Sequence, residues 1–409
     1  MKIAIIGKGA SSFGVVLALE TKYKFISQVD IYSKKKIITH DKNIFSGNQI
    51  NNFLKKNIQS LNIPSKINIQ TGEVADQELF NETYEQMSLW GASFIPFSKE
   101  DIESSGLKWR EVITSYNEIS KKVPISGNSK DKIEDYYQNT FINESKVEID
   151  DNLHHIIKKC NTNNMYLNFV TGYARLALSV NDNKQFEKCE CIINNCVKHN
   201  LFSSTEINKY IINSKLKTNF INHDIFKINF ENKKIIYNDH NQEKKSKNYD
   251  LIFICSGAKS LLSILGNSLN IEKLSISDSS SYLFPLLAIN GNIFKKNSYN
   301  FSLTSVISKV IHHNLSSKEE YFLQFYKTPE YLWKNLFSSY LWPLNIILSK
   351  ILSKIIYVGS IYLDNNYVTE YDITYKNNKI SYVSHQKEAK GKVSFIIKNL
   401  NQKLGKRLI

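Results

Sequence analysis

The fold is decided by the stretch Met1-Lys-Ile-Ala-Ile-Ile-Gly-Lys-Gly-Ala-Ser-Ser12, in which an apolar strand runs into a glycine turn and then into an apolar helix. Gly7 permits a sharp turn, and Gly9 lets a pyrophosphate approach the main chain. The N–H groups at the start of the helix, expected from about residue 10 to 20, then point at the phosphates. Ser12 replaces the third glycine of the G-x-G-x-x-G pattern and is still small enough for close packing. We therefore predict a dinucleotide site that includes Gly7, Gly9, Ala10, Ser11 and Ser12.

A second strand is expected at Val29-Asp-Ile-Tyr-Ser33. In dinucleotide-binding folds an acidic residue at the end of this strand holds the ribose hydroxyls. Strand register places Ser33 at that position, whereas a residue count from the glycine turn gives Asp30. Because the connection before the strand is only a few residues long, we favour Ser33, whose hydroxyl bonds a ribose more weakly than a carboxylate. The alternative for Asp30 is that it does not bind the ribose and is only a strand residue whose side chain faces solvent.

A second nucleotide marker is the stretch Asn248-Tyr-Asp-Leu-Ile-Phe-Ile-Cys-Ser-Gly257, which predicts a buried parallel strand at 251–255 and a Ser-Gly turn. Alternating apolar residues at 219–228 and 235–237 predict a β-meander before it. Flavoproteins of the two-dinucleotide-fold type use such a late strand to close over FAD, and simple NAD enzymes lack it. FAD is therefore the expected cofactor, and Ile225, Ser256 and Gly257 join the site. A NAD(P)-dependent reductase that uses only the first turn is the alternative.

Composition indicates a globular protein without affinity for nucleic acid. A chain of 409 residues can bury a large core and is expected to hold two interleaved domains. The formal net charge is +15, but lysines and asparagines are spread along the whole chain. The chain contains neither an arginine-rich arm nor a helix-turn-helix pattern, so we expect no nucleic-acid partner.

The cysteines and histidines predict neither disulfides nor a metal site. Because Met1 already belongs to the first strand, no signal peptide is expected, and the five cysteines should be reduced in a cytoplasmic protein. The spacing Cys189-x-Cys191-x4-Cys196 matches neither zinc nor iron–sulfur motifs, and only His199 offers a further ligand. Structural roles are expected for these cysteines, and surface or packing roles for the pairs His154-His155 and His312-His313.

An amphipathic helix is predicted after Pro343, a residue that suits the first helical position. The charge-free run around it, 335–349, has only 15 residues and is too short to span a bilayer. One helical face is apolar, and we expect it to pack in the core of the substrate domain, with contact to a membrane surface as the alternative. That face consists of Leu344, Ile347, Leu348, Ile351, Leu352 and Ile355.

Several further motifs follow one another in the order in which one known protein family carries them. The segment Ser88-Leu-Trp-Gly-Ala-Ser-Phe-Ile-Pro-Phe-Ser-Lys-Glu-Asp-Ile102 has a Trp-Gly-Ala core followed by a helix capping box at 98–101. Downstream lie Gly172-Tyr-Ala-Arg-Leu-Ala-Leu178, Cys196 with Leu201-Phe-Ser-Ser204, the Ser256-Gly257 turn and Asp278-Ser-Ser-Ser-Tyr-Leu-Phe-Pro-Leu-Leu287. Over nearly its entire length the chain resembles the FAD-dependent glucose–methanol–choline oxidoreductases, in particular their bacterial surface-polysaccharide subgroup.

The resemblance implies an α/β fold in which a Rossmann-like, three-layer ββα domain for FAD is interleaved with an α+β substrate domain. The FAD domain would comprise 1–98 and 165–265, and the substrate domain 99–164 and 266–409. Trp90, Gly91 and Ala92 would contact the flavin. The implied reaction is hydride transfer from an alcohol group of a sugar or sugar conjugate, including lipid-linked ones, to the flavin. An enzyme acting on lipid-linked sugars could sit at the inner face of the membrane.

The chain departs from this family at the expected catalytic histidine. The family carries it in a glycine-framed segment near the C-terminus, but the last histidine here, His385, lies in Tyr382-Val-Ser-His-Gln-Lys-Glu388 without glycines. The catalytic residue is therefore unknown. We expect an enzyme whose catalytic segment is supplied by a partner chain, or an inactive FAD-binding subunit.

Overall fold

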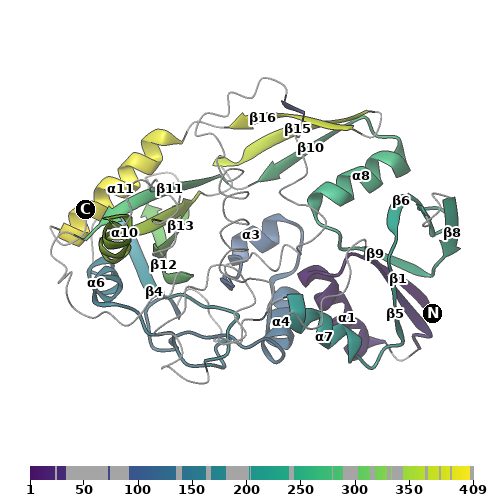
Figure 1. Cartoon of the computed structure of the whole chain (residues 1–409), viewed down its shortest axis with the longest axis horizontal. Coiled ribbons are helices and arrows are strands. Elements are labelled where there is room, and N and C mark those ends of the chain that lie inside the picture. Colours follow the sequence, from purple (N-terminus) through teal and green to yellow (C-terminus); the bar gives the residue numbers. More distant parts are fainter. Residues whose placement is uncertain are drawn as a thin grey trace. The chain divides into compact units, whose positions relative to one another are not determined.

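The computed structural model describes residues 1–23, 25–33, 72–73, 92–134, 141–162, 167–180, 202, 204–238, 244–278, 280–288, 303–313, 318–328, 333, 344–363, 367–376, 379–386 and 389–405 (Figure 1). The chain divides into two compact units, each built from separated stretches. Unit 1 comprises Met1–Leu89, Ser203–Ser277 and Glu370–His385, and unit 2 comprises Trp90–Phe202, Asp278–Thr369 and Gln386–Ile409. One sheet is parallel and the others are antiparallel in the pairings described, so the expected α/β class is confirmed.

Unit 1 is organised around a parallel sheet with the strand order β5-β2-β1-β9. The strands are β1 (Lys2–Ile6), β2 (Gln28–Tyr32), β5 (Thr218–Ile221) and β9 (Leu251–Ile254). Helix α1 (Ala10–Lys22) connects β1 with β2, and α7 (Ser204–Ile212) precedes β5. These two helices lie side by side (Figure 1), because Phe13 meets Tyr210 edge-to-face and the Tyr210 hydroxyl donates to Glu20 Oε2 at 2.6 Å.

An antiparallel meander covers one face of this parallel sheet. It consists of β6 (Asp224–Asn229), β7 (Lys234–Asn238) and β8 (Lys244–Asn248). Because successive strand residues point to opposite faces, Ala4 and Ile6 meet Ile228 and Ile235 of the meander, while Ile5 faces the other way and is equally buried. Helix α8 (Ala258–Leu269) follows β9 and packs on β6.

The predicted meander needs one correction, at its first strand. The stretch 219–228 is two strands: β5 joins the parallel sheet beside β2, and the meander begins only at β6. Asn222 and His223 separate the two strands. Alternating hydrophobicity identifies a strand but carries no information on whether its partner runs parallel or antiparallel.

A further sheet of unit 1 has the order β10-β15-β16-β3. Its strands are β10 (Lys273–Asp278), β15 (Thr369–Lys376), β16 (Lys379–Gln386) and the short β3 (Gly72–Glu73). Thus a stretch close to the C-terminus returns to the unit that contains the N-terminus.

Unit 2 contains a five-stranded antiparallel sheet with the order β11-β14-β13-β12-β4. The strands are β4 (Leu167–Tyr173), β11 (Ser281–Leu287), β12 (Thr304–His313), β13 (Lys318–Lys327) and β14 (Ile356–Tyr362). Helices α6 (Asp151–Cys160) and α11 (Lys390–Leu404) pack against each other and share one hydrophobic core with this sheet. The first part of the unit also contains helices α3 (Lys99–Ser104) and α4 (Trp109–Ser120), and α10 (Leu344–Ile355) directly precedes β14. The predicted capping box is confirmed, because Ser98 Oγ accepts the Asp101 N–H at 3.1 Å.

A polar cluster around Glu319 ties α11 to the sheet of unit 2. Tyr321 donates its hydroxyl to Glu319 Oε2 at 2.5 Å, His312 Nδ1 lies 3.0 Å from the same oxygen, and Lys392 of α11 forms an ion pair with it. Burial alone would raise the pKa of Glu319. The hydrogen bonds from Lys392, Tyr321 and His312 outweigh that cost and lower the pKa from 4.5 to about 2.

Replacing Glu319 with Gln is expected to destabilise unit 2 by about 2–3 kcal/mol at neutral pH. A carboxyl whose folded-state pKa is lowered stabilises the fold above its unfolded pKa, and this stabilisation is lost as the pH falls through the folded value. The wild-type free energy of unfolding should therefore drop between pH 4.5 and about pH 2, and E319Q should lack that drop. Urea unfolding across this pH range measures both quantities. Parallel pH curves for the two proteins would contradict the prediction.

Candidate dinucleotide site

At the carboxyl edge of the parallel sheet, the strands β2, β1 and β9 end at residues that are paired with one another. Ile6 of β1 lies opposite Ile254 of β9 and opposite Tyr32 of β2. The bonding continues one residue past the strands, because Cys255 N–H donates to the Ile6 carbonyl at 2.6 Å and Gly7 N–H donates to the Tyr32 carbonyl at 2.8 Å. Three predicted site segments, 7–12, Ser33 and 256–257, therefore leave the sheet at its carboxyl edge, where ligands of open α/β sheets bind.

Gly7 is required by the packing of β1 against β9. It has a φ of +109°, and a Cβ at this position would lie 2.2 Å from the Cys255 carbonyl oxygen. Ser12 fixes the same turn from the helix side, since its fully buried hydroxyl donates to the Gly7 carbonyl at 2.8 Å. Burial also raises the pKa of the neighbouring Cys255 thiol. Through these contacts, Gly7, Ser12 and Cys255 hold the turn between β1 and α1 against the end of β9.

Gly9, in contrast, borders open space. It is the N-cap of α1 with extended backbone angles, no side chain caps the helix, and its first turn contains no acidic residue. A Cβ at Gly9 would meet nothing within 4 Å. Ala10 and Ser11, the first residues of the helix, are exposed. The positive end of the α1 dipole is therefore accessible to an anion.

The neighbouring strand β9 leads into a second helix start of the same kind. Gly257, at a φ of +78°, is the N-cap of α8, which also lacks a side-chain cap and an acidic first turn. Before it, the Ser256 hydroxyl is buried and has no hydrogen-bond partner within the described residues. Buried hydroxyls are normally bonded to protein, water or ligand, so this one is a candidate ligand contact. Two uncapped helix N-termini thus begin beyond adjacent strands.

Asp30 is a buried structural carboxylate, so its alternative assignment as a solvent-facing strand residue is wrong. It is 0% exposed in the middle of β2. Burial opposes its ionisation, but its hydrogen bonds outweigh this and hold its pKa below 3.8. The donors are Lys247, Tyr249 (2.6 Å), Asn219 (3.0 Å) and Gln28 (2.6 Å). Ser33 instead directly follows the strand, and its N–H donates to the Ile221 carbonyl at 3.0 Å.

Of the other predicted cofactor residues, the structure describes Ile225 and Ala92. Ile225 of β6 is half-buried and packs against the core beneath the meander. Ala92 belongs to unit 2, where it is fully buried with a φ of +55°, and its carbonyl accepts the Ala177 N–H at 2.7 Å. A small residue suits that backbone conformation. Trp90 and Gly91 lie outside the described residues.

Among the residues that the structure describes, the remaining sequence candidates form no enclosed catalytic or metal arrangement. Cys189, Cys191, Cys196 and His199 lie outside the described residues, and within the described part no three His, Cys, Asp or Glu side chains gather as a metal site would require. His155 Nε2 lies 3.1 Å from the Leu404 carbonyl, a packing role, and exposed His154 contacts the Tyr173 hydroxyl. His385 pairs with Asp372 at 3.1 Å, with more than half of each side chain exposed.

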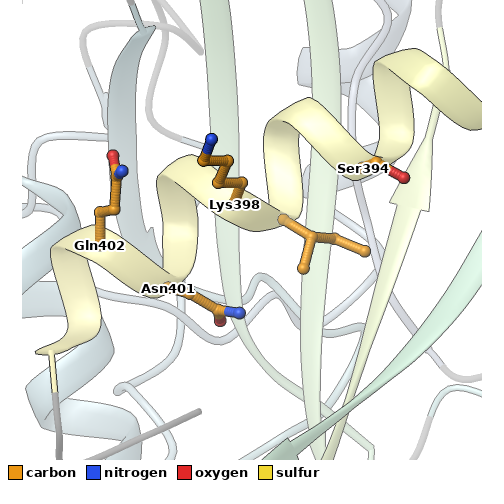
Figure 2. A pocket seen from close by; sticks show the side chains of 5 residues that line it. Ser394, Lys398, Asn401 and Gln402 are labelled. Atoms are coloured by element: carbon orange, nitrogen blue, oxygen red, sulfur yellow. The ribbon is translucent and has the colours of Figure 1, made fainter.

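A shallow, open depression, which no sequence motif predicted, runs along α11 in unit 2. Figure 2 shows Ser394, Lys398, Asn401 and Gln402 along this helix, with Ile397 completing the lining. The residues offer an amine, two amides and a hydroxyl, but all five come from a single helix. Small-molecule sites are typically enclosed by several elements, so the carboxyl edge of unit 1 is the stronger candidate.

Neither family models nor curated proteins indicate a function for the chain. No protein-family model matches the chain, and no curated protein matches it. The accessible helix starts, the open space at Gly9 and the unpartnered Ser256 hydroxyl are therefore the features from which a function is inferred.

Proposed function

We propose that unit 1 binds FAD and that the protein is an FAD-dependent oxidoreductase acting on an alcohol group of a sugar or sugar conjugate. The observation that carries the proposal is the pair of uncapped helix N-termini, α1 and α8, which begin beyond the adjacent strands β1 and β9. Each offers backbone N–H groups and a positive dipole end to a negatively charged group.

The residues at the carboxyl edge fit a dinucleotide. The pyrophosphate would lie at Gly9 and the first turn of α1. A Cβ at Gly9 would meet nothing within 4 Å, so the space in front of this residue is open to a ligand. The Ser33 hydroxyl would serve the ribose, and the buried Ser256 hydroxyl would gain the partner that it lacks among the described residues. Trp90, Gly91 and Ala92 are proposed as flavin contacts by resemblance alone.

The meander favours FAD over a nicotinamide cofactor. In unit 1 the strands β6, β7 and β8 cover one face of the parallel sheet, and β9 re-enters the sheet directly after the meander. This order of a first βαβ turn, a meander and a returning strand is the one expected of two-dinucleotide-fold flavoproteins. A simple Rossmann nicotinamide site would need only the first turn.

The chemistry divides between cofactor and chain. When bound, FAD would supply the hydride-accepting group, and the chain's residues would bind and orient it. Alcohol oxidation also needs a base for the hydroxyl proton. We assign that role to no described residue, because His385 and Asp372 form an exposed pair. A non-catalytic FAD-binding subunit is accordingly the second candidate.

FAD uptake by the purified chain tests the proposal. The protein should be yellow, or become so on incubation with FAD, and should show a flavin absorbance band after gel filtration. Titration of FAD fluorescence gives the dissociation constant, with NAD and NADP as competitors. A chain that takes up no FAD would overturn the proposal, and one that binds only NAD or NADP would favour a nicotinamide reductase.

A further inference from the structure

Helix α10 of unit 2 turns two serines inward and three of its large apolar side chains outward. Its serines point inward: Ser349 is 0% exposed and Ser353 is 7% exposed. Leu344, Ile347 and Leu348 are 56%, 54% and 38% exposed. Ile351, Leu352 and Ile355 on the same stripe are half-buried. The expected packing of this stripe in the core is therefore wrong for its first three residues.

The buried serines need no partner from outside the helix. Ser349 Oγ donates to the Ile346 carbonyl at 2.9 Å, and Ser353 Oγ donates to the Lys350 carbonyl at 3.1 Å. Because these hydroxyls are satisfied within α10, the small serine face can lie against the protein at little cost. The orientation that leaves the larger apolar side chains outside is thus consistent with the hydrogen bonding of the helix.

Strand β11 brings further exposed apolar side chains to the same part of unit 2. Leu283 is 76% exposed and Leu287 is 41% exposed. Ala288 N–H donates to the Ile355 carbonyl at 2.8 Å, and Leu287 lies opposite Ile356, so the end of β11 lies against the end of α10. Exposed apolar side chains on two elements that meet are typical of an interaction surface.

The charges of α10 favour an anionic partner. The helix carries Lys350 and Lys354 and no acidic residue, and both lysines border the exposed stripe on the side of Ile347. A second copy of the chain docked through the same surface would bring like charges together. An apolar stripe bordered by lysines is the pattern of a helix that lies in a bilayer interface, where the lysines meet anionic headgroups.

We propose that unit 2 docks peripherally on an anionic phospholipid surface through α10, assisted by Leu283 and Leu287 of β11. Leu344, Ile347 and Leu348 insert among the acyl chains, and Lys350 and Lys354 remain at headgroup level. No helix in the described ranges combines the length and the apolar character that crossing a bilayer requires, so the contact is at the surface. The proposal is independent of FAD binding.

Flotation of the full chain with liposomes tests this docking. The protein should float with vesicles of phosphatidylcholine and phosphatidylglycerol and remain at the bottom with phosphatidylcholine alone. The double variant I347E/L348E should lower the vesicle partition coefficient about tenfold or more, and K350E or K354E about fivefold or more each. The matched control is F25E, which alters an apolar side chain of unit 1 that is 88% exposed and should leave partition unchanged.

Three outcomes would overturn the proposal. The first is a wild-type chain that floats with neither vesicle, and the second is an equal loss of partition in F25E and I347E/L348E. The third is a dimer in gel filtration that I347E/L348E converts to a monomer, because a second copy would then occupy the surface. All the substituted side chains are exposed or border the exposed stripe, so circular dichroism should confirm that each variant folds.

Discussion

Replacing Gly9 with valine is expected to abolish FAD uptake while leaving the fold intact. A Cβ at Gly9 meets nothing of the described protein within 4 Å, so the valine has room. It would occupy the space in front of the α1 N-terminus, where the pyrophosphate is proposed to bind. Losing the charge-assisted hydrogen bonds between the pyrophosphate and the backbone N–H groups there should raise the FAD dissociation constant about 100-fold or more. Fluorescence titration of FAD measures the change.

The matched control for this variant is Gly14→Val in the same helix. Gly14 also has nothing within 4 Å of an added Cβ, but it lies in the second turn of α1, away from the helix N-terminus. G14V should bind FAD as the wild type does. Equal binding by G9V and the wild type, or equal losses in G9V and G14V, would remove Gly9 from the site. Unaltered urea unfolding of G9V would show that the loss concerns the ligand.

The parts of unit 1 that are predictable from the sequence are those with local signals. The apolar runs before Gly7 and before Ser256 correspond to β1 and β9, and the helix between the first turn and the second strand was predicted to within two residues of its observed end at Lys22. In each case a glycine marks the point where the strand must turn. Ser33 at the end of β2 follows from strand register in the same way.

The environment of Asp30 could not be predicted in this way. Its partners Lys247 and Tyr249 lie more than 200 residues further along the chain and reach it only because the meander folds over the sheet. An acidic residue within a short strand is normally solvent-facing, since burying a charge is costly unless it is paired. The pairing here is tertiary and leaves no pattern near residue 30.

For helix α10, in contrast, the local pattern predicted the element but not which of its faces is buried. Its bounds and its apolar stripe were predictable, but periodicity reports only that two faces differ. Which face turns inward depends on the elements packed beside the helix. In unit 2 the serine face turns inward, and the hydroxyls of Ser349 and Ser353 are satisfied by carbonyl groups of their own helix. The pattern therefore predicted the helix correctly, and the expected burial was wrong for Leu344, Ile347 and Leu348.

Replacing Gly7 with alanine is expected to destabilise unit 1 by about 4 kcal/mol, whether or not FAD is present. An added Cβ would lie 2.2 Å from the Cys255 carbonyl oxygen and 2.9 Å from the Ser256 nitrogen, and both are backbone atoms that cannot rotate away. The φ of +109° adds strain for any residue with a side chain. The hydrogen bonds that hold the ends of β1, β2 and β9 level would have to shift.

Urea unfolding of Gly7→Ala and of the control Gly14→Ala measures this effect. Gly14 lies inside α1 with open space around it, so alanine there should raise the free energy of unfolding by about 0.5–1 kcal/mol. A G7A variant within about 1 kcal/mol of the wild type would mean that β1 and β9 do not approach as closely as described. With Gly9→Val, the pair of substitutions separates two roles within one turn: Gly7 is a glycine because β9 packs against it, whereas Gly9 is proposed to be a glycine because a ligand binds there.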